Sequence, residues 1–250
     1  MTVAELILVR HAESTGNVAR EQAEASGAEV IPVEARDADV ELSELGKRQA
    51  EQLGRFLRLA DSARLPTAVW SSPYVRARQT AAGIMAAAGM VGQPRTDERL
   101  RDKELGILDT LTNIGVRARY PLEEDRRRWL GKFYYRAPGG ESWADLALRL
   151  RSVLIDLDIA EHDERVMVVT HDAVITMLRY VCEGLDEAQV LALARSDVLV
   201  NTGVTRLVRD GHGVWRVTAA NQQEHLLADF AGADLRTEHP AGPIDGTSRR

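Results

Sequence analysis

Three short apolar segments of the sequence share one pattern, which constrains the fold more than any other feature. Each is a run of three or four apolar residues that ends in polar residues and is followed by a longer helix-like stretch. The runs are Leu6–Val9, Ala68–Trp70 and Val166–Val169. Continuous apolar runs without alternation are typical of strands that are buried on both faces of a parallel sheet. With helices between the strands, the sequence predicts an α/β fold with a mostly parallel sheet.

Helices and a hairpin are expected around these strands. Helical spacing and capping residues predict helices at Ser43–Leu59, Val75–Ala88, Ser142–Leu157 and Ala173–Cys182. Val204–Val208 and Val214–Val217 flank a glycine-containing turn and predict a β-hairpin. From about Asp229 the hydrophobic periodicity stops, so residues 229–250 are expected to be a flexible tail after one domain of residues 1–228.

The composition excludes several classes of protein. The 250 residues carry 32 basic and 38 acidic side chains, a net charge of −6, so no nucleic-acid partner is expected. Cys182 is the only cysteine, which excludes an internal disulfide and a cysteine-rich zinc site. The chain starts without a basic segment before its apolar run and has no apolar stretch of membrane-spanning length. We therefore expect a cytoplasmic protein with no membrane partner.

Residues 103–140 differ from the rest of the chain and are called the cap segment below. They contain eight basic and five acidic residues, a net charge of +3 in a chain of −6, and five of the twelve aromatic residues. Such a composition fits a helical cap over an anion-binding site. It fits equally well a surface helix whose aromatic residues pack on the core and whose arginines face water, and the sequence leaves both interpretations open.

Polar residues stand where the predicted strands end. Arg10 and His11 follow the first strand, Thr170 and His171 follow the third, and Arg76 lies just beyond the second. Because ligands bind at the carboxyl ends of strands in open α/β sheets, these side chains are expected to converge. Arginine suits phosphate oxygens and neutral imidazole is a nucleophile near physiological pH. The combination indicates phosphoryl chemistry.

The same residues resemble motifs of a known family, the histidine phosphatase superfamily, whose first branch includes the cofactor-dependent phosphoglycerate mutases. Residues 8–14 with Asn17 look like its Arg-His-Gly-Glu signature, residues 72–81 are similar to its second block, and residues 138–142 and 169–171 are similar to later ones. The similarity runs in order from Leu8 to about Leu226. It implies a three-layer α/β/α fold of the phosphoglycerate mutase type with a helical cap.

The resemblance also implies roles for individual residues. His11 would be the nucleophile that forms a phosphohistidine, while Arg10, Arg76 and His171 would hold the phosphoryl oxygens. Asn17 would be an additional donor, and Glu13 would orient an arginine. The substrate would be a small phosphorylated molecule, and neither a metal nor a cofactor is expected.

The proton donor is less certain from the sequence, because this chain departs from the family pattern twice. Asp102 stands where the family usually has a glutamate, and Asp172 follows the second histidine where glycine is common. Asp102 is the favoured acid and Asp172 is the alternative. The competing interpretation of Asp172 is a residue at a helix N-terminus, where the helix dipole favours a negative charge. Glu104 is a third candidate.

These residues predict a metal-independent phosphomonoester hydrolase. The alternatives are a phosphoglycerate mutase, disfavoured by Gly16 where the mutases usually have tryptophan, and a non-catalytic phosphate-binding module. Arg101, Arg126 and Arg136, together with Arg127 and Arg128, are candidates to bind a second anionic group. Asp37 and Asp39 resemble an aspartyl-phosphate motif, but no apolar strand precedes them, so a solvated loop is expected. The sequence leaves the substrate and the oligomeric state open.

Overall fold

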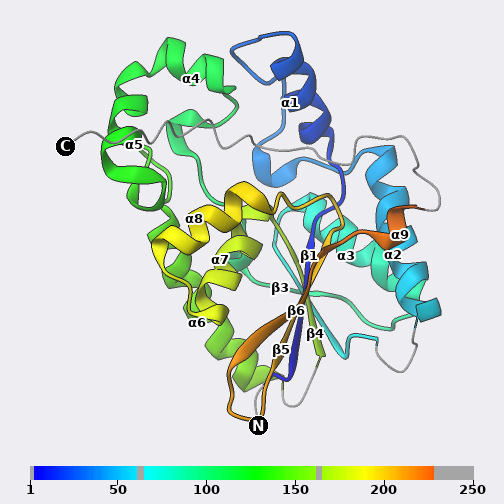
Figure 1. Ribbon diagram of the computed structural model, residues 1–250. Helices are drawn as coiled ribbons and strands as arrows, with labels where there is room; N and C mark the ends of the chain where they lie inside the picture. Colours follow the sequence, from blue (N-terminus) through cyan, green and yellow to red (C-terminus); the bar gives the residue numbers. More distant parts are fainter. Residues whose placement is uncertain (1–2, 61–64, 162–164, 228–250) are drawn as a thin grey trace.

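One six-stranded sheet forms the centre of the protein. The computed structural model describes residues 3–60, 65–161 and 165–227. The strands are β1 (Glu5–Arg10), β2 (Ala68–Ser71), β3 (Arg95–Thr96), β4 (Arg165–Thr170), β5 (Val204–Arg209) and β6 (Trp215–Gln222). Their order is β3-β2-β4-β1-β5-β6, in which the first four are parallel and β5 and β6 form an antiparallel hairpin at one edge (Figure 1).

Both faces of the sheet are buried, as the apolar runs predict. Side chains alternate between the faces along a strand, so Leu6 and Leu8 of β1 belong to one apolar cluster while Ile7 and Val9 belong to the other. All four are at most 1% exposed. A strand with two buried faces needs helices on both sides, which is why the sheet is the middle of three layers.

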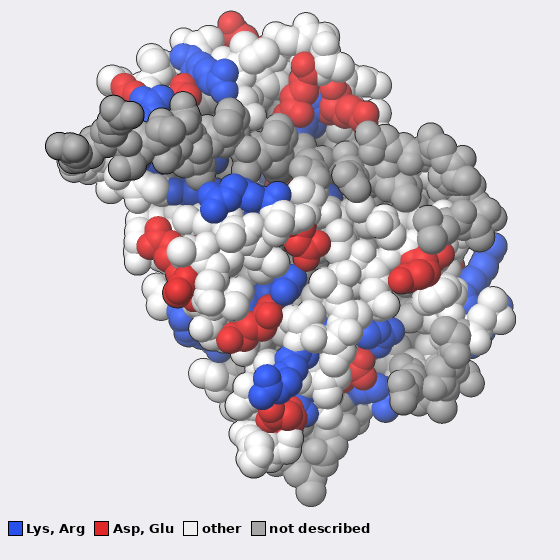
Figure 2. Space-filling view, in the orientation of Figure 1, with Lys and Arg blue, Asp and Glu red and all other residues white. Residues whose placement is uncertain are grey.

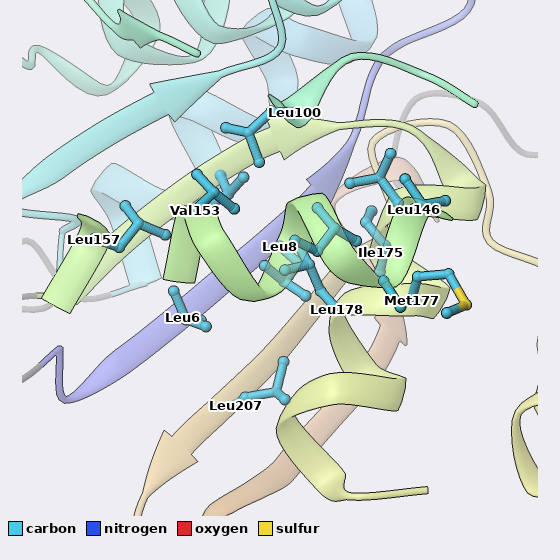
Figure 3. Packing of buried hydrophobic residues seen from close by; sticks show 14 of the residues in the cluster. Leu6, Leu8, Leu100, Leu146, Val153, Leu157, Ile175, Met177, Leu178 and Leu207 are labelled. Atoms are coloured by element: carbon cyan, nitrogen blue, oxygen red, sulfur yellow. The ribbon is translucent and has the colours of Figure 1, made fainter. Parts of the chain in front are cut away.

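The first layer packs on the face that carries Leu6 and Leu8. It consists of α6 (Trp143–Ala160), α7 (Asp172–Glu183) and α8 (Glu187–Ser196), whose apolar residues close over the sheet (Figures 1 and 3). Ser142 begins α6 with a reciprocal capping box to Asp145.

The second layer packs on the face that carries Ile7 and Val9. It consists of α2 (Glu44–Ala60) and α3 (Val75–Ala88), which lie against one another. Ser43 accepts a hydrogen bond from the Gly46 N–H at 2.9 Å and thereby satisfies one of the free amides at the start of α2.

The remaining elements gather mainly at the end of the sheet where the parallel strands finish. Figure 1 shows α1 (Thr15–Ala25), α4 (Asn113–Arg119) and α5 (Pro121–Tyr134) at this end. Short 3-10 turns at Asp37–Asp39, Glu98–Leu100 and Gly106–Leu108 and the short helix α9 (Glu224–Leu227) complete the described chain. The cap segment therefore provides α4 and α5, with a break in α5 at Gly131, where φ is 74°. No helix among the described residues is long and apolar enough to cross a membrane.

The α/β fold, its three principal strands and the four expected helices are confirmed to within about three residues at their ends. The hairpin is also confirmed, but its second strand continues to Gln222 instead of ending at Val217. Among the helices and strands, α1, α8, α9 and β3 were not predicted. α1 is largely polar and buries only Ala23, so it has almost no apolar periodicity to detect. The predicted flexible tail lies outside the described residues.

Gly46 allows the start of α2 to approach the loop that carries the first histidine. A Cβ atom on Gly46 would lie 2.0 Å from the carbonyl oxygen of Glu13. This contact is with backbone, which cannot move aside as the end of a flexible side chain could. The glycine is thus required by the close approach of helix and loop.

Gly46→Ala should therefore destabilise the protein by about 1–3 kcal/mol, the usual range for overpacking. Chemical denaturation of the variant measures the free energy of unfolding. The matched control is Gly211→Ala, since a Cβ atom there meets nothing within 4 Å. An equal loss in both variants would contradict the steric argument.

Candidate active site

The two histidines are neighbours because β1 and β4 are adjacent and parallel. Arg10 and Thr170 are register partners at the ends of these strands, so His11 and His171 follow them side by side. The backbone N–H of His11 donates to the carbonyl oxygen of Thr170 at 2.8 Å, and the centres of the two imidazole rings lie 5.1 Å apart. Residues separated by 160 positions thereby share one site, as the strand ends predict.

Arg76 and Asp102 complete this group. Arg76 lies in the first turn of α3, directly after β2, and only 4% of it is exposed. Asp102 follows the 3-10 turn Glu98–Leu100, and its Oδ2 lies 3.3 Å from Arg76 Nη2 and 3.4 Å from His171 Nδ1. Arg10 is also buried and donates from Nη1 to the carbonyl oxygen of Leu199.

The loop that carries Asp102 is fixed by buried hydrogen bonds. The Thr170 hydroxyl donates to the Leu100 carbonyl at 2.7 Å, and Arg149 Nη2 donates to the Asp102 carbonyl at 3.0 Å. Glu141 accepts two hydrogen bonds from Arg149, both at 2.9 Å, and so orients that arginine. Asp102 Oδ1 accepts the Lys103 N–H at 2.8 Å, which leaves Oδ2 directed at Arg76 and His171.

His11 is arranged as a neutral imidazole with one free ring nitrogen. Its Nδ1 lies 2.8 Å from the carbonyl oxygen of Ala12, which can only accept, so Nδ1 carries the proton and Nε2 keeps a free electron pair. Burial lowers the pKa of His11 well below its usual value, and the nearby charges of Arg76, His171 and Arg10 lower it further. The imidazole is therefore unprotonated at neutral pH.

His171 is equally buried, at 1% exposure. Its Nε2 lies 2.8 Å from the Ser72 hydroxyl, while Nδ1 has no hydrogen-bond partner among the described residues. Burial lowers the pKa of His171 to about 3, against the opposing charge of Asp102 and with the help of Arg76. That nitrogen faces Asp102 Oδ2 at 3.4 Å, and His171 is not among the residues that line the cavity described below.

The two candidate acids have opposite electrostatics. Burial alone would raise the pKa of Asp102, but the electrostatic interactions with His171 and with the charged Arg76 outweigh burial and hold that pKa well below its usual range. Burial raises the pKa of Asp172, which stands at the first residue of α7, against the lowering effect of Arg10. In the ligand-free site Asp102 is ionised.

A cavity of about 290 Å³ opens over these groups. Arg10, His11, Arg76 and Asp102 are among its lining residues, and so is Asp172. Its lining also includes apolar residues such as Ile31, Val33, Leu108 and Val116, and three cations from the cap segment, Lys103, Arg127 and Lys132. Among the residues that the structure describes, no group of three or more histidine, cysteine or acidic side chains is arranged to hold a metal ion.

Comparison with known proteins agrees with this geometry. The sequence model of the histidine phosphatase superfamily, branch 1, matches residues 6–223, which contain the whole site. The chain belongs to this superfamily. The phosphoglycerate mutase-like fold and the resemblance drawn from the sequence motifs are thereby confirmed.

Several relatives of this histidine phosphatase have been described. A mycobacterial glucosyl-3-phosphoglycerate phosphatase is 28% identical, with a TM-score of 0.69 over 88% of this chain and 99% of that one. YhfR of Bacillus stearothermophilus is 25% identical, with a TM-score of 0.70 over 89% and 98%. The 6-phosphofructo-2-kinase/fructose-2,6-bisphosphatase of Arabidopsis thaliana is 30% identical over 71% of this chain, which spans only 21% of that protein. The family, the mycobacterial phosphatase and the plant bisphosphatase support phosphatase activity for the chain.

Asn17 and Glu13, two residues of the signature that follows β1, make hydrogen bonds that the resemblance does not imply. Asn17 lines the cavity, but its Oδ1 accepts hydrogen bonds from the Ser14 N–H and hydroxyl, both at 3.0 Å. It thus begins α1 as part of a capping box. Glu13 was expected to orient an arginine, and this was wrong, because its carboxylate accepts a hydrogen bond from the Ser43 hydroxyl at the start of α2.

Of the five arginines predicted to bind a second anion, Arg127 lines the cavity, whereas Arg101, Arg126, Arg128 and Arg136 do not. Arg101 pairs with Glu104 and Glu141, Arg126 pairs with Glu123, and Arg136 pairs with Asp145. Glu104, the third candidate acid, also lies outside the lining and accepts a hydrogen bond from the Tyr74 hydroxyl. Figure 2 shows basic and acidic side chains interspersed on the face in view, without a large area of one sign.

Residues that reasoning from the sequence missed provide much of the cavity wall. Lys103 and Lys132 were not candidates, and Arg127 was one of five arginines that the sequence could not rank. Asp37, expected in a solvated loop, lines the cavity and forms an ion pair with Arg76. No local signal marks such residues, since their orientation depends on turns and on ion pairs formed by their neighbours.

Proposed function

We propose that the protein is a phosphomonoester hydrolase that works through a phosphohistidine on His11, without a metal. The observation that carries the proposal is the neutral His11, whose protonated Nδ1 donates to Ala12 and whose Nε2 is left as the nucleophile. Nε2 attacks phosphorus, the ester oxygen leaves with a proton, and water then cleaves the P–N bond to release inorganic phosphate. A mycobacterial phosphatase with 27% identity and a TM-score of 0.67 has been solved with inorganic phosphate.

Arg10, Arg76 and His171 would hold the phosphoryl oxygens during this transfer. All three are buried and adjoin His11, so they supply positive charge and hydrogen-bond donors where negative charge develops. Their surroundings exclude water, which strengthens each electrostatic interaction. The site thereby supplies cationic stabilisation of the kind that metal ions provide in other phosphoryl-transfer enzymes.

Asp102 is proposed as the acid that protonates the leaving oxygen. Its low pKa in the ligand-free site depends on its interactions with His171 and with the charge of Arg76. A phosphoryl dianion bound to Arg76 offsets that charge and adds a like charge nearby, and both changes raise the pKa of a carboxyl group. Substrate binding would therefore load Asp102 with the proton that it donates. Asp172 remains the alternative because its pKa is already raised.

A second anionic group on the substrate is supported by the pairing pattern of the cap segment. The structure gives Lys103, Arg127 and Lys132 no ion pair with any described residue. The other cap arginines all pair with carboxylates, including Arg117 with Glu124 and Arg119 with Glu29. Burial and the charges of Arg127 and Lys103 lower the pKa of Lys132 to about 8, with Asp172 opposing. Lys132 Nζ instead lies 4.6 Å from the centre of the Trp143 ring. Cations that repel one another in a cavity and have no carboxylate partner favour an anionic ligand.

The first test is phosphate release from a panel of phosphomonoesters in excess chelator, with wild type beside His11→Ala. Release by the wild type should vanish in the variant, because the proposed covalent intermediate forms on His11. Persistent release by His11→Ala would contradict the proposed mechanism. Transfer of labelled phosphate between positions of glycerate without net release would identify a mutase instead, and binding without any turnover would identify the phosphate-binding module.

Leaving-group dependence separates the two candidate acids. Asp102→Asn should slow hydrolysis of an alkyl phosphate by roughly 10² to 10⁴, the usual contribution of a general acid. It should slow p-nitrophenyl phosphate far less, because nitrophenolate leaves without a proton. Asp172→Asn is the matched control, and it should change the rate of hydrolysis of both esters by similar factors. The reverse pattern between the two variants would assign the acid to Asp172.

The second anionic group can be tested by comparing cations of α5 that form ion pairs with cations of α5 that form none with the described residues. Arg127→Ala and Lys132→Ala should raise KM for a phosphate ester that carries a carboxylate by roughly tenfold, with little change in kcat. Neither should change KM for p-nitrophenyl phosphate, which has no second anion. Arg126→Ala and Arg128→Ala are the controls, because their side chains pair with Glu123 and Asp125. Equal effects of all four variants would rule out the subsite.

A further inference from the structure

The guanidinium of Arg76 is already engaged by a carboxylate that the mechanism above does not use. Arg76 Nη1 donates to Asp37 Oδ1 at 2.9 Å and to the Asp37 carbonyl oxygen at 2.5 Å, and Nη2 donates to Asp37 Oδ2 at 3.2 Å. Nη2 also donates to Asp102 at 3.3 Å. The Arg76 guanidinium lies 4.9 Å from the centre of the Tyr74 ring, which limits its freedom to turn.

These bonds use the groups that a phosphoryl ligand would need. The two terminal nitrogens of an arginine carry four N–H groups, and the four bonds to Asp37 and Asp102 employ both nitrogens. Asp37 binds them in the bidentate fork that arginine also offers to phosphate. A phosphoryl oxygen can therefore bind the fork of Arg76 only if an aspartate releases it.

Asp37 is the aspartate that can leave. Its side chain is 45% exposed, whereas Asp102 is 28% exposed and its Oδ1 is held by the Lys103 N–H. Asp37 stands in the 3-10 turn Asp37–Asp39, between α1 and α2, at the lining of the cavity. If it stayed, two carboxylates and a phosphoryl dianion would share one guanidinium. Burial and Asp102 already raise the pKa of Asp37, against the lowering effect of Arg76.

We propose that Asp37 is a specificity-determining residue that competes with the phosphoryl group for Arg76. Each phosphate ester must displace this carboxylate, so the net affinity is low for ligands that offer only a phosphoryl group. An ester with a second anchoring group can use that additional binding energy to complete the exchange. Inorganic phosphate, the product, has no second group and is released readily. This inference rests on the phosphoryl-binding role of Arg76 in the proposed function.

A purely structural role for Asp37 makes the opposite prediction. If the carboxylate merely held Arg76 in place for the substrate, its removal would free the guanidinium to move and would weaken phosphate binding. If it competes, its removal strengthens phosphate binding. The sign of the change therefore distinguishes the two roles.

The deciding experiment is calorimetric titration of the full-length protein with inorganic phosphate, which requires no turnover. Asp37→Asn should lower the Kd for phosphate by about tenfold or more, because a charged competitor becomes neutral. Asp37→Ala, which has no side-chain acceptor, should change Kd in the same direction. Asp39→Asn is the control, since Asp39 lies in the same turn but pairs with Arg36 on the surface, and its Kd should match the wild type. An unchanged or higher Kd in Asp37→Asn, or no detectable binding in any variant, overturns the proposal.

Steady-state kinetics supply a second readout. In Asp37→Asn the KM for p-nitrophenyl phosphate should fall by a similar factor, and phosphate should become a stronger competitive inhibitor. An unchanged KM beside an unchanged Kd for phosphate overturns the proposal. This outcome is independent of the His11→Ala test. If Asp37→Asn binds phosphate more tightly but His11→Ala still releases phosphate, this inference stands and the proposed mechanism fails.

Discussion

The parallel pairing of β1 with β4 is the constraint on which the site depends. It places Arg10 opposite Thr170 and therefore sets His11 beside His171 immediately after the strands end. A shift of one residue in this register would move every side chain of β1 to the other face of the sheet. Leu6 and Leu8 would then leave one apolar cluster for the other, so the two cores that stabilise the fold also fix the two histidines.

Burial then determines the chemistry of the groups that the sheet brings together. Both histidines lie among cations and are at most 4% exposed, so protonation would place further positive charge in a site with little water. The imidazoles stay neutral, while the arginines keep their charge because guanidinium does not deprotonate in proteins. The same environment thus provides a neutral imidazole with a free electron pair and fixed positive charge side by side. Asp102 offsets part of that charge in the ligand-free site.

The sequence predicts the fold and the centre of the site well because both depend on local patterns. Buried strands need continuous apolar runs, and residues at strand ends follow directly from those runs, which is how Arg10, His11 and His171 could be located. The cavity wall could not be predicted in this way. Whether Arg126 or Arg127 faces the cavity depends on which one meets Glu123, and Lys132 reaches the lining just after the break of α5 at Gly131. Such choices are settled by tertiary contacts and leave no periodic signal.

Asp37 and the unpaired cap cations together suggest how one site could combine loose binding of phosphate with selection of its substrate. A site of buried arginines alone would bind any phosphoryl group tightly, and it would also retain its product. A competing carboxylate on Arg76 lowers the affinity for all phosphoryl groups equally. Cations at Lys103, Arg127 and Lys132 restore affinity only for a ligand with a second anion. Hydrolysis separates the two anions into different molecules, so each product loses the combined attraction that held the substrate.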